Sequence, residues 1–374
     1  MDTEIVKLHF TSPLHLGAEG TGVEKTYDFL HSDTLFSAIC HGWLKIYGRK
    51  SLECLLKEFP KVDQTSIPTP FVISSAFPFV EKSDGTTYFL PKPLKRPPFP
   101  EFEERPSQER KEAKKVKKTL DDMGLIDLEF FWEWAKTVEP EDFDTKRWKS
   151  YQERFNEIRE MLDKSVTSDI RPRVTKDRRT GNSLLYHFGL IYFSEDEGKG
   201  KSGLYFLVKC RDEDVENRLK AVLKLLGEIG IGGERSSGYG RFKAEWCELD
   251  ERWAIPQEIL DYPSGRVTLS LYYPSNYDAV LPVVNYGLLR RTGWVESPFA
   301  PKPEHRLVVH MFEEGSIFDV NKNLSLFKIA PLSIPAETFG VGALVDVAPK
   351  KFLDRIGHSV YRYGLAFTVP VILS

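Results

Sequence analysis

Cysteine is scarce in this chain and is never closely paired. The 374 residues include four cysteines, and no two of them form a CxxC motif; they are Cys40, Cys54, Cys210 and Cys247. Closely spaced cysteines are typical of zinc sites and disulfide frameworks. We therefore expect no metal site and no disulfide, and we place the chain in the reducing cytoplasm.

Long apolar runs are also missing. No run of about 18 apolar residues, the length needed to cross a bilayer, occurs in the sequence. The chain begins MDTEIVKLHF, where apolar residues alternate as in a strand, instead of with a basic segment followed by an apolar one. We expect a protein that is neither exported nor inserted in a membrane.

The chain has no overall excess of positive charge, since its formal net charge is −3. Phosphate binding depends on local patches, however, and basic residues gather in two segments. Residues 92–120 contain ten Lys or Arg against five Glu, and residues 170–180 contain five against one Asp. The first segment is also rich in proline, which suggests an insertion; it is either a solvated tether or a surface for RNA or a partner.

The order of predicted strands and helices indicates an α+β protein. We expect two tandem ferredoxin-like (RRM-like) domains with antiparallel sheets, over residues 1–250 and 265–374, and an insertion in the first at about 91–165. The first βαββαβ unit is predicted from strands at 4–10, 71–79 with 86–90, 184–193, 203–210 and 242–249. Its two helices are predicted after an N-cap at Ser32 or Asp33 and from 213 to 226, where Gly227 ends the second. The second unit is predicted from strands at 266–273 and 365–372.

A glycine-rich stretch at 230–241 separates the second of these helices from the last strand of the first unit. Its glycines allow positive φ and close approach, so we expect its amides to form an anion site. It fits neither a Walker loop nor a dinucleotide fingerprint, because its glycines follow a helix and precede a strand; no nucleotide cofactor is expected. A flexible linker is the alternative, but linkers rarely contain so many glycines flanked by arginine.

Three motifs together resemble the RAMP superfamily, the RRM-like RNA-binding subunits of CRISPR effector complexes. The glycine-rich stretch resembles the loop that precedes the last strand in that superfamily. The segments Leu8–Phe10, Pro13–Gly17 and Ser32–Ala38 (SDTLFSA) resemble the type III-A (Csm) subunit that holds the 5′ tag of the CRISPR RNA (crRNA). The segment 171–181, followed by a strand, resembles the thumb β-hairpin that such subunits push across the RNA.

The resemblance implies a non-catalytic cap that binds the crRNA 5′ tag, the large polymerase-like subunit and a backbone RAMP subunit. In such complexes base pairing reads the target while the protein holds backbone and shape. Arg290, Arg291 and Arg355 either extend the RNA groove or meet the large subunit. The RNA-binding candidates are His15, Gly17, Ser32, Asp33, Thr34, Arg171, Arg173, Lys176, Arg178, Arg179, Gly230, Gly232, Gly233, Arg235, Ser236, Ser237, Gly238, Tyr239, Arg241 and Tyr363.

Two other functions stay open at this point. A metal-independent endoribonuclease that processes crRNA precursor would need an acid and a base, for which His15, His31 and Asp33 are candidates. A general single-strand RNA-binding module would lack tag preference. Structural roles for the histidines, and an N-cap role for Asp33, favour the non-catalytic reading. The sequence has no GGDD or HD pair, so cyclic-oligonucleotide synthesis and DNA cutting would belong to the partner.

Overall fold

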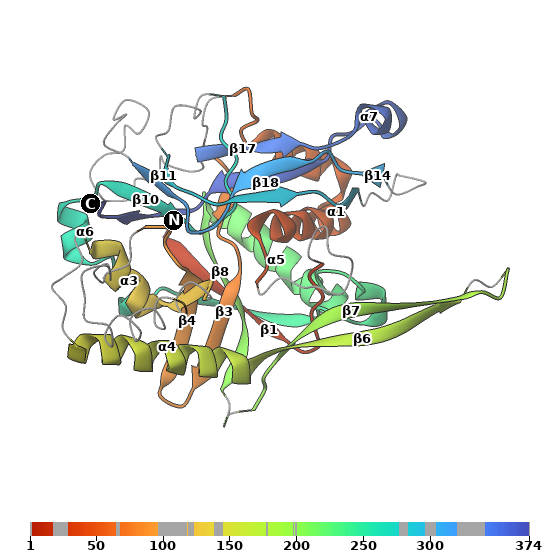
Figure 1. Cartoon of the computed structure of the whole chain (residues 1–374). Coiled ribbons are helices and arrows are strands. Elements are labelled where there is room, and N and C mark those ends of the chain that lie inside the picture. Colours follow the sequence, from red (N-terminus) through yellow and green to blue (C-terminus); the bar gives the residue numbers. More distant parts are fainter. Residues whose placement is uncertain are drawn as a thin grey trace.

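The computed structural model shows a mixed α/β protein built on antiparallel sheets (Figure 1). The residues that it describes are 2–17, 29–64, 68–95, 118, 123–137, 145–176, 179–196, 198, 200–276, 283–295, 304–319 and 341–373. The predicted fold class is confirmed at this level. No helix within these ranges combines the length and the apolar character needed to cross a membrane.

A seven-stranded sheet forms the first unit. Its strands are β1 (Thr3–Phe10), β2 (Phe71–Ile73), β3 (Phe77–Lys82), β4 (Gly85–Pro91), β5 (Leu125–Asp127), β8 (Lys201–Cys210) and β9 (Phe242–Glu248). They lie in the order β5-β4-β3-β8-β1-β9, β2 also pairs with β8, and every pair is antiparallel. The predicted first and last strands are thus confirmed, and they are neighbours in the sheet.

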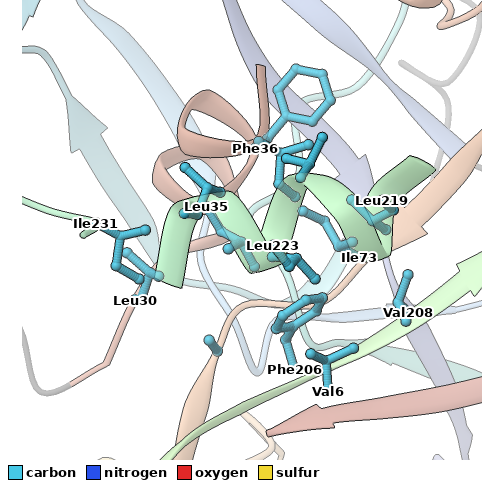
Figure 2. Packing of buried hydrophobic residues seen from close by; sticks show 14 of the residues in the cluster. Val6, Leu30, Leu35, Phe36, Ile73, Phe206, Val208, Leu219, Leu223 and Ile231 are labelled. Carbon is cyan, nitrogen blue, oxygen red and sulfur yellow. The ribbon is translucent and has the colours of Figure 1, made fainter. Parts of the chain in front are cut away.

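Two long helices, α1 (Ser32–Lys57) and α5 (Glu213–Ile229), cover one face of this sheet. Figure 2 shows the apolar side of α5 above the sheet, with Leu219 and Leu223 close to Phe206 of β8 and Val6 of β1. All four side chains are buried. This packing holds the two helix ends that contribute to the site described below.

Both helix boundaries differ from the prediction. The N-cap of α1 is His31, so Ser32 and Asp33 are its first helical residues and not its cap. The helix α5 ends at Gly230 instead of Gly227. A Cβ on Gly227 would lie 2.4 Å from the carbonyl oxygen of Phe242, so this glycine allows the close approach of β9 and does not end the helix.

The opposite face of the sheet is covered by part of the predicted insertion. Helices α3 (Leu128–Lys136) and α4 (Thr145–Ser165) contribute Phe130, Trp134 and Phe155 to a buried cluster. The longer of the two, α4, has 21 residues. This part of the insertion is therefore integral to the core.

The basic segment 92–120 lies outside the described residues apart from its first part and Lys118. Within the first part, Lys95 Nζ donates hydrogen bonds to the carbonyl oxygens of Thr137 and Ile372, at 2.6 Å each. Burial lowers the pKa of Lys95 to about 8. This lysine therefore ties three distant segments together, although the sequence suggested a solvated charge.

A β-hairpin extends from the body of the molecule (Figure 1). It consists of β6 (Val166–Lys176) and β7 (Ser183–Phe193), which pair along their whole length. The arginine-rich segment therefore forms a β-hairpin with the strand that follows it, as expected.

The second unit is a four-stranded sheet with smaller two-stranded ones beside it. The four strands are β10 (Gly265–Thr268), β11 (Val283–Asn285), β16 (Ile317–Asp319) and β19 (Thr368–Val371), in the order β11-β16-β10-β19. The smaller pairs are β12 (Leu288–Arg291) with β15 (Val309–Phe312), β13 (Trp294–Val295) with β14 (Glu304–His305), and β17 (Val341–Asp346) with β18 (Tyr361–Ala366). The described helical segments here and in the linker are η2 (Glu251–Trp253), α6 (Gln257–Asp261) and α7 (Lys350–Ile356).

The two units share their hydrophobic clusters. Val267 and Val371 of the second unit belong to the same buried cluster as Phe77 and Tyr205 of the first. On the other face of the sheet, Leu365 joins the cluster around α1 and α5. The two units are therefore packed together through shared buried clusters on both faces of the large sheet.

Candidate nucleic-acid interface

The glycine-rich stretch 230–241 closes on the loop that follows β1. The amide of Gly233 donates to the carbonyl oxygen of His15 at 2.9 Å, and that of Gly240 donates to Pro13 at 2.8 Å. The amide of Ile231 donates to Gly240 at 3.0 Å. These amides are used inside the protein, so the expected anion site of free loop amides is wrong for them.

Close packing explains why glycine is needed at two of these positions. Gly232 has φ of +81°, and a Cβ there would lie 2.4 Å from the carbonyl oxygen of His15. Gly240 has φ of +72°, and its Cβ would lie 1.9 Å from the carbonyl oxygen of Ile231. Backbone oxygens cannot yield as a flexible side chain can, so these glycines shape the loop against its neighbours.

The hairpin is joined to this loop part-way along its length. Arg173 of β6 forms an ion pair with Glu234 and a hydrogen bond of 3.1 Å with Ser237 Oγ. Its guanidinium lies 4.8 Å from the ring centre of Phe188 and 5.6 Å from that of Tyr239. Two elements that the sequence treated as separate RNA contacts are thus one connected structure.

His15 completes the joint from the third side. Its Nδ1–H donates to the carbonyl oxygen of Gly189 on β7 at 2.6 Å, and its ring meets that of Phe188 edge-on. The side chain is buried. His15 therefore orients the hairpin relative to the glycine-rich stretch.

The hairpin has two different faces, because residues alternate along a strand. On one face Arg171 lies over Tyr192, 5.4 Å from its ring centre. The other face exposes apolar side chains of both strands, which are Ile170, Val174 and Leu185 at 57%, 63% and 59%. A surface that is aromatic and basic on one side and apolar on the other suits a single strand of nucleotides, whose bases stack and whose phosphates attract cations.

A groove lies between the two units, and we call it the basic groove. Its cavity of about 270 Å³ is bordered by the loop after β1, the N-terminal half of α1, the glycine-rich stretch and three segments of the second unit. Its arginines are Arg235, Arg291, Arg306 and Arg362. The predicted residues that line it are His15, Gly17, Thr34, Gly232, Gly233 and Arg235.

Asp33 holds two of these arginines in place from below. Arg291 donates to its carboxylate through Nε at 3.0 Å and through Nη2 at 2.8 Å, and Arg362 forms a second ion pair with it. Burial raises the pKa of Asp33, but the charges of Arg291 and Arg362 outweigh burial and hold it well below its usual range. One carboxylate thus compensates two guanidinium groups, which leaves the base of the groove positive.

The Nε–H of Arg362 is buried and has no acceptor within the described part of the chain. Arg362 is 3% exposed and Arg291 is 4% exposed. A buried donor of this kind gains more from an anion than a solvated one does, because water does not compete for it. Arg362 thus brings to the groove a guanidinium whose hydrogen bonding is incomplete within the described residues.

Three predicted contacts are corrected by the structure. Asp33 is an interior ion-pair partner and Ser32, fully buried, accepts a hydrogen bond from the amide of Leu271 at 3.1 Å. Tyr363 is also fully buried, where its hydroxyl accepts from the amide of Ile73 at 3.1 Å. None of the three side chains has a surface on which a nucleotide can rest.

The other predicted residues lie along the loop and the hairpin. Ser236, Ser237 and Arg241 are exposed on the outer side of the glycine-rich stretch, and Gly230 is the C-cap of α5. Arg171, Lys176 and Arg179 are exposed on the hairpin, while Arg178 lies outside the described residues. The described basic candidates therefore divide between the groove, the hairpin and, for Arg241, the exposed end of the glycine-rich stretch.

Sequence reasoning missed Arg306, Arg362 and Trp294, all of which line the groove. Arg362 stands next to the predicted Tyr363 on β18, and neighbouring residues of a strand point to opposite sides. The alternation could have identified Arg362 if it had been known that the side chain of Tyr363 points away from the groove. Trp294 lies in the two-residue strand β13 and Arg306 follows the two-residue strand β14, so neither gives a periodic signal.

The three catalytic candidates all have structural contacts. His31 Nδ1 lies 2.9 Å from Glu314 Oε1, and both side chains are buried. His15 is bound to Gly189, and Asp33 to two arginines. An acid and a base of a nuclease would have to meet a ribose hydroxyl and a leaving oxygen directly, which these contacts do not favour.

Family models match both units of the chain. The RAMP superfamily matches residues 7–243, and the CRISPR Csm4 C-terminal domain matches residues 263–371. The first match covers more than half of the chain. The chain thus belongs to the RAMP superfamily.

Curated relatives narrow the assignment. The CRISPR system Cms protein Csm4 of Thermococcus onnurineus (strain NA1) is 30% identical over 346 residues, with 92% of this chain and 93% of the relative covered. The protein of the same name from Methanocaldococcus jannaschii is 25% identical over 402 residues, with 99% and 97% covered. The chain belongs to the Csm4 family.

Solved structures agree with the fold. The Csm4 chain of a Csm3-Csm4 subcomplex of the type III-A CRISPR-Cas interference complex matches with a TM-score of 0.57 at 19% identity, with 99% of both chains covered. A chain of a Csm1-Csm4 cassette in complex with pppApA matches with a TM-score of 0.55 at 23% identity, over 100% of this chain and 99% of that one. At these identities the likeness concerns the fold alone.

Proposed function

We propose that this chain is the crRNA-binding, non-catalytic subunit of a type III-A CRISPR effector complex, and that the basic groove holds the 5′ tag. The observation that carries the proposal is that Arg291 and Arg362 are buried at the groove and held by ion pairs with Asp33. Arg235 and Arg306 also border the groove. Fixed guanidinium groups recognise phosphates at defined positions. A tag of constant sequence needs such a fixed register.

The hairpin takes the role of the thumb in this proposal. Arg173 and His15 tie the hairpin, part-way along its length, to the loop beside the groove, so RNA that leaves the groove meets the hairpin next. Its basic and aromatic face supplies general attachment through phosphates and stacking. The hairpin then marks where the tag ends and the guide begins.

The arrangement of the first unit supports a ferredoxin-like origin for this site. The strand order β9-β1-β8-β3, with α1 after β1 and α5 after β8, corresponds to the βαββαβ connection. We extend the proposal to a second, less regular copy over 265–374. The boundary between residues 250 and 265 falls between the two matched family segments.

The proposed partners are a large polymerase-like subunit and a backbone RAMP subunit, in the cytoplasm. The support is that solved relatives are described as Csm1-Csm4 and Csm3-Csm4 assemblies. Catalysis would then belong to other subunits. This division agrees with the structural contacts of His15, His31 and Asp33.

Binding of tagged RNA tests the proposal directly. The complex is reconstituted with Arg235→Ala plus Arg306→Ala, and its affinity is measured by fluorescence anisotropy for a guide with its natural tag and for one with a scrambled tag. We expect the double variant to lose about tenfold or more for the tagged guide, because a charge-assisted hydrogen bond contributes about 1.5–3 kcal/mol. The loss for the scrambled guide should be smaller.

Arg159→Ala plus Arg218→Ala is the matched control. Both arginines form exposed i,i+4 ion pairs on α4 and α5, away from the groove. This variant should bind as the wild type does. Equal losses in both double variants, or metal-independent cleavage of a crRNA precursor by the purified chain, would contradict the proposal.

A further inference from the structure

A second cavity lies between the two units, and its lining differs entirely from that of the basic groove. It has a volume of about 120 Å³ and is bordered by the ends of β1, β2 and β8, by α3 and η2, and by β10 and β19. Its walls are mainly apolar and come from Val72, Trp132, Leu207, Leu249, Ile255 and Phe367. We call it the Arg266 cavity, after its central charged residue.

Arg266 places a guanidinium in this apolar setting. It lies on β10, between β16 and β19, and its Nη1 donates to Thr368 Oγ1 at 2.9 Å. Burial lowers the pKa of Arg266, and no carboxylate among the described residues offsets that effect. A guanidinium stays protonated in proteins, so its charge is left without a counter-ion there.

A second unsatisfied donor borders the same cavity. Trp253 of η2 is 7% exposed, and its Nε1–H has no acceptor within the described ranges. The other tryptophan of the lining, Trp132, donates to the carbonyl oxygen of Arg252 at 3.2 Å. Buried polar groups are usually satisfied, so an exception beside an uncompensated charge indicates a missing acceptor.

The surrounding charges keep the cavity positive. Lys209 of β8 borders it, and burial lowers the pKa of this lysine while the charge of Asp2 raises it. Asp2 is exposed, whereas Arg266 is half-buried. The cavity thus combines cationic and N–H donors with an apolar enclosure.

We propose that the Arg266 cavity binds a small carboxylate that carries a short aliphatic stem. The planar guanidinium matches the two oxygens of a carboxylate, and the apolar walls take up the stem. An inorganic phosphate or sulfate would leave those walls without apolar contacts. The ligand is either a free short-chain acid or the side chain of a glutamate or aspartate on a partner protein.

Butyrate and butyramide form a suitable pair of probes, because they have similar shape and differ in charge. Binding of each to the full chain is measured at pH 7 by titration calorimetry and by the shift of thermal unfolding. We expect saturable binding of butyrate at millimolar concentration, a rise in the unfolding temperature, and no such effect of butyramide. Equal effects of the two, or no saturable binding of butyrate, would mean that the cavity holds only water and would overturn the proposal.

Variants locate the site. Arg266→Gln should weaken butyrate binding by about tenfold or more, the loss of one charge-assisted contact, and Trp253→Phe by a smaller factor. Arg159→Gln, an exposed arginine of α4 outside the cavity, is the matched control and should bind as the wild type does. The unfolding temperature of each variant without ligand shows whether it folds, and unchanged butyrate binding by a folded Arg266→Gln would also overturn the proposal.

The two sources of the carboxylate are distinguished in the assembled complex. If a partner supplies the group, the complex no longer binds butyrate and Arg266→Gln loosens the assembly. If the ligand is a free acid, the complex binds butyrate as the isolated chain does. RNA binding in the basic groove is measured in parallel, so that loss of tag recognition and loss of this site are separate results.

Discussion

Arginine has opposite settings in the basic groove and on the hairpin. In the groove, Arg291 and Arg362 are buried and share Asp33, which fixes their orientation. On the hairpin, Arg171 is exposed and pairs only locally with Asp169, whereas Arg173 is bound to the glycine-rich stretch. Arginine is therefore buried and fixed by an ion pair in the groove, whereas Arg171 on the hairpin is a solvent-exposed charge.

This difference shows how one protein can fix the position of a bound RNA in one region and add general affinity for RNA in another. Exposed charges interact with any phosphate, and salt screens them. Buried charges cannot move or be hydrated, so they favour one arrangement of the ligand. Under the proposed function the groove would select the tag, and the hairpin would add affinity that does not depend on sequence.

The largest expected effect comes from removing the carboxylate that fixes the groove. Asp33→Asn leaves two buried guanidinium groups without their counter-charge, and breaking such a pair costs about 3–5 kcal/mol of unfolding free energy. Chemical denaturation of the purified chain measures the change. The matched control is Asp84→Asn, an exposed residue in the turn between β3 and β4, where the change should stay within about 0.5 kcal/mol.

The same ion pair predicts a difference in acid stability. The pKa of Asp33 is lower in the folded than in the unfolded state, so its stabilisation is fully present above the unfolded value of about 3.9 and is lost as pH falls below it. The gap in unfolding free energy between wild type and Asp33→Asn should therefore narrow below about pH 4. A gap that stays constant from pH 7 to pH 2 would show that the charge of Asp33 does not stabilise the fold.

Two glycines of the stretch provide a smaller, structural comparison. Gly232 and Gly238 both have positive φ, but a Cβ on Gly232 would meet the carbonyl oxygen of His15, whereas one on Gly238 meets nothing within 4 Å. Gly238→Ala should cost about 1 kcal/mol from its backbone conformation alone, and Gly232→Ala clearly more. Thermal unfolding and tagged-RNA affinity should both separate the two variants; equal behaviour would contradict the packing role of Gly232.

The smallest expected effect is on the hairpin. Replacing Arg171, Lys176 and Arg179 by alanine should lower affinity for tagged and scrambled guides alike. It should also reduce the slope of log affinity against log salt by about 2, since each phosphate contact on a single strand contributes about 0.7. Anisotropy titrations at several salt concentrations measure both quantities. If the triple variant lost affinity for the tagged guide alone, the hairpin would recognise the tag as the groove does, and the proposed difference between the two regions would be wrong.

Local features were readable from the sequence. The strand β1, the helix α5 and the glycine-rich stretch lie where periodicity and glycine spacing placed them, because those signals act over a few residues. The hairpin lies where the resemblance to the RAMP superfamily placed it. Helix ends were less accurate, and Gly227 shows why. A glycine that permits close packing cannot be told from one that ends a helix without knowing what lies beside it.

The chain alone thus determined the motif that resembles the RAMP superfamily, since the glycines, the SDTLFSA segment and the arginine-rich hairpin are contiguous features. Only the tertiary structure decided what Asp33 does. Its partners Arg291 and Arg362 lie 258 and 329 residues away along the chain. Asp33, predicted to contact RNA, is buried and forms ion pairs with these two arginines instead. Burial and long-range charge pairing depend on the whole fold, and no local pattern encodes them.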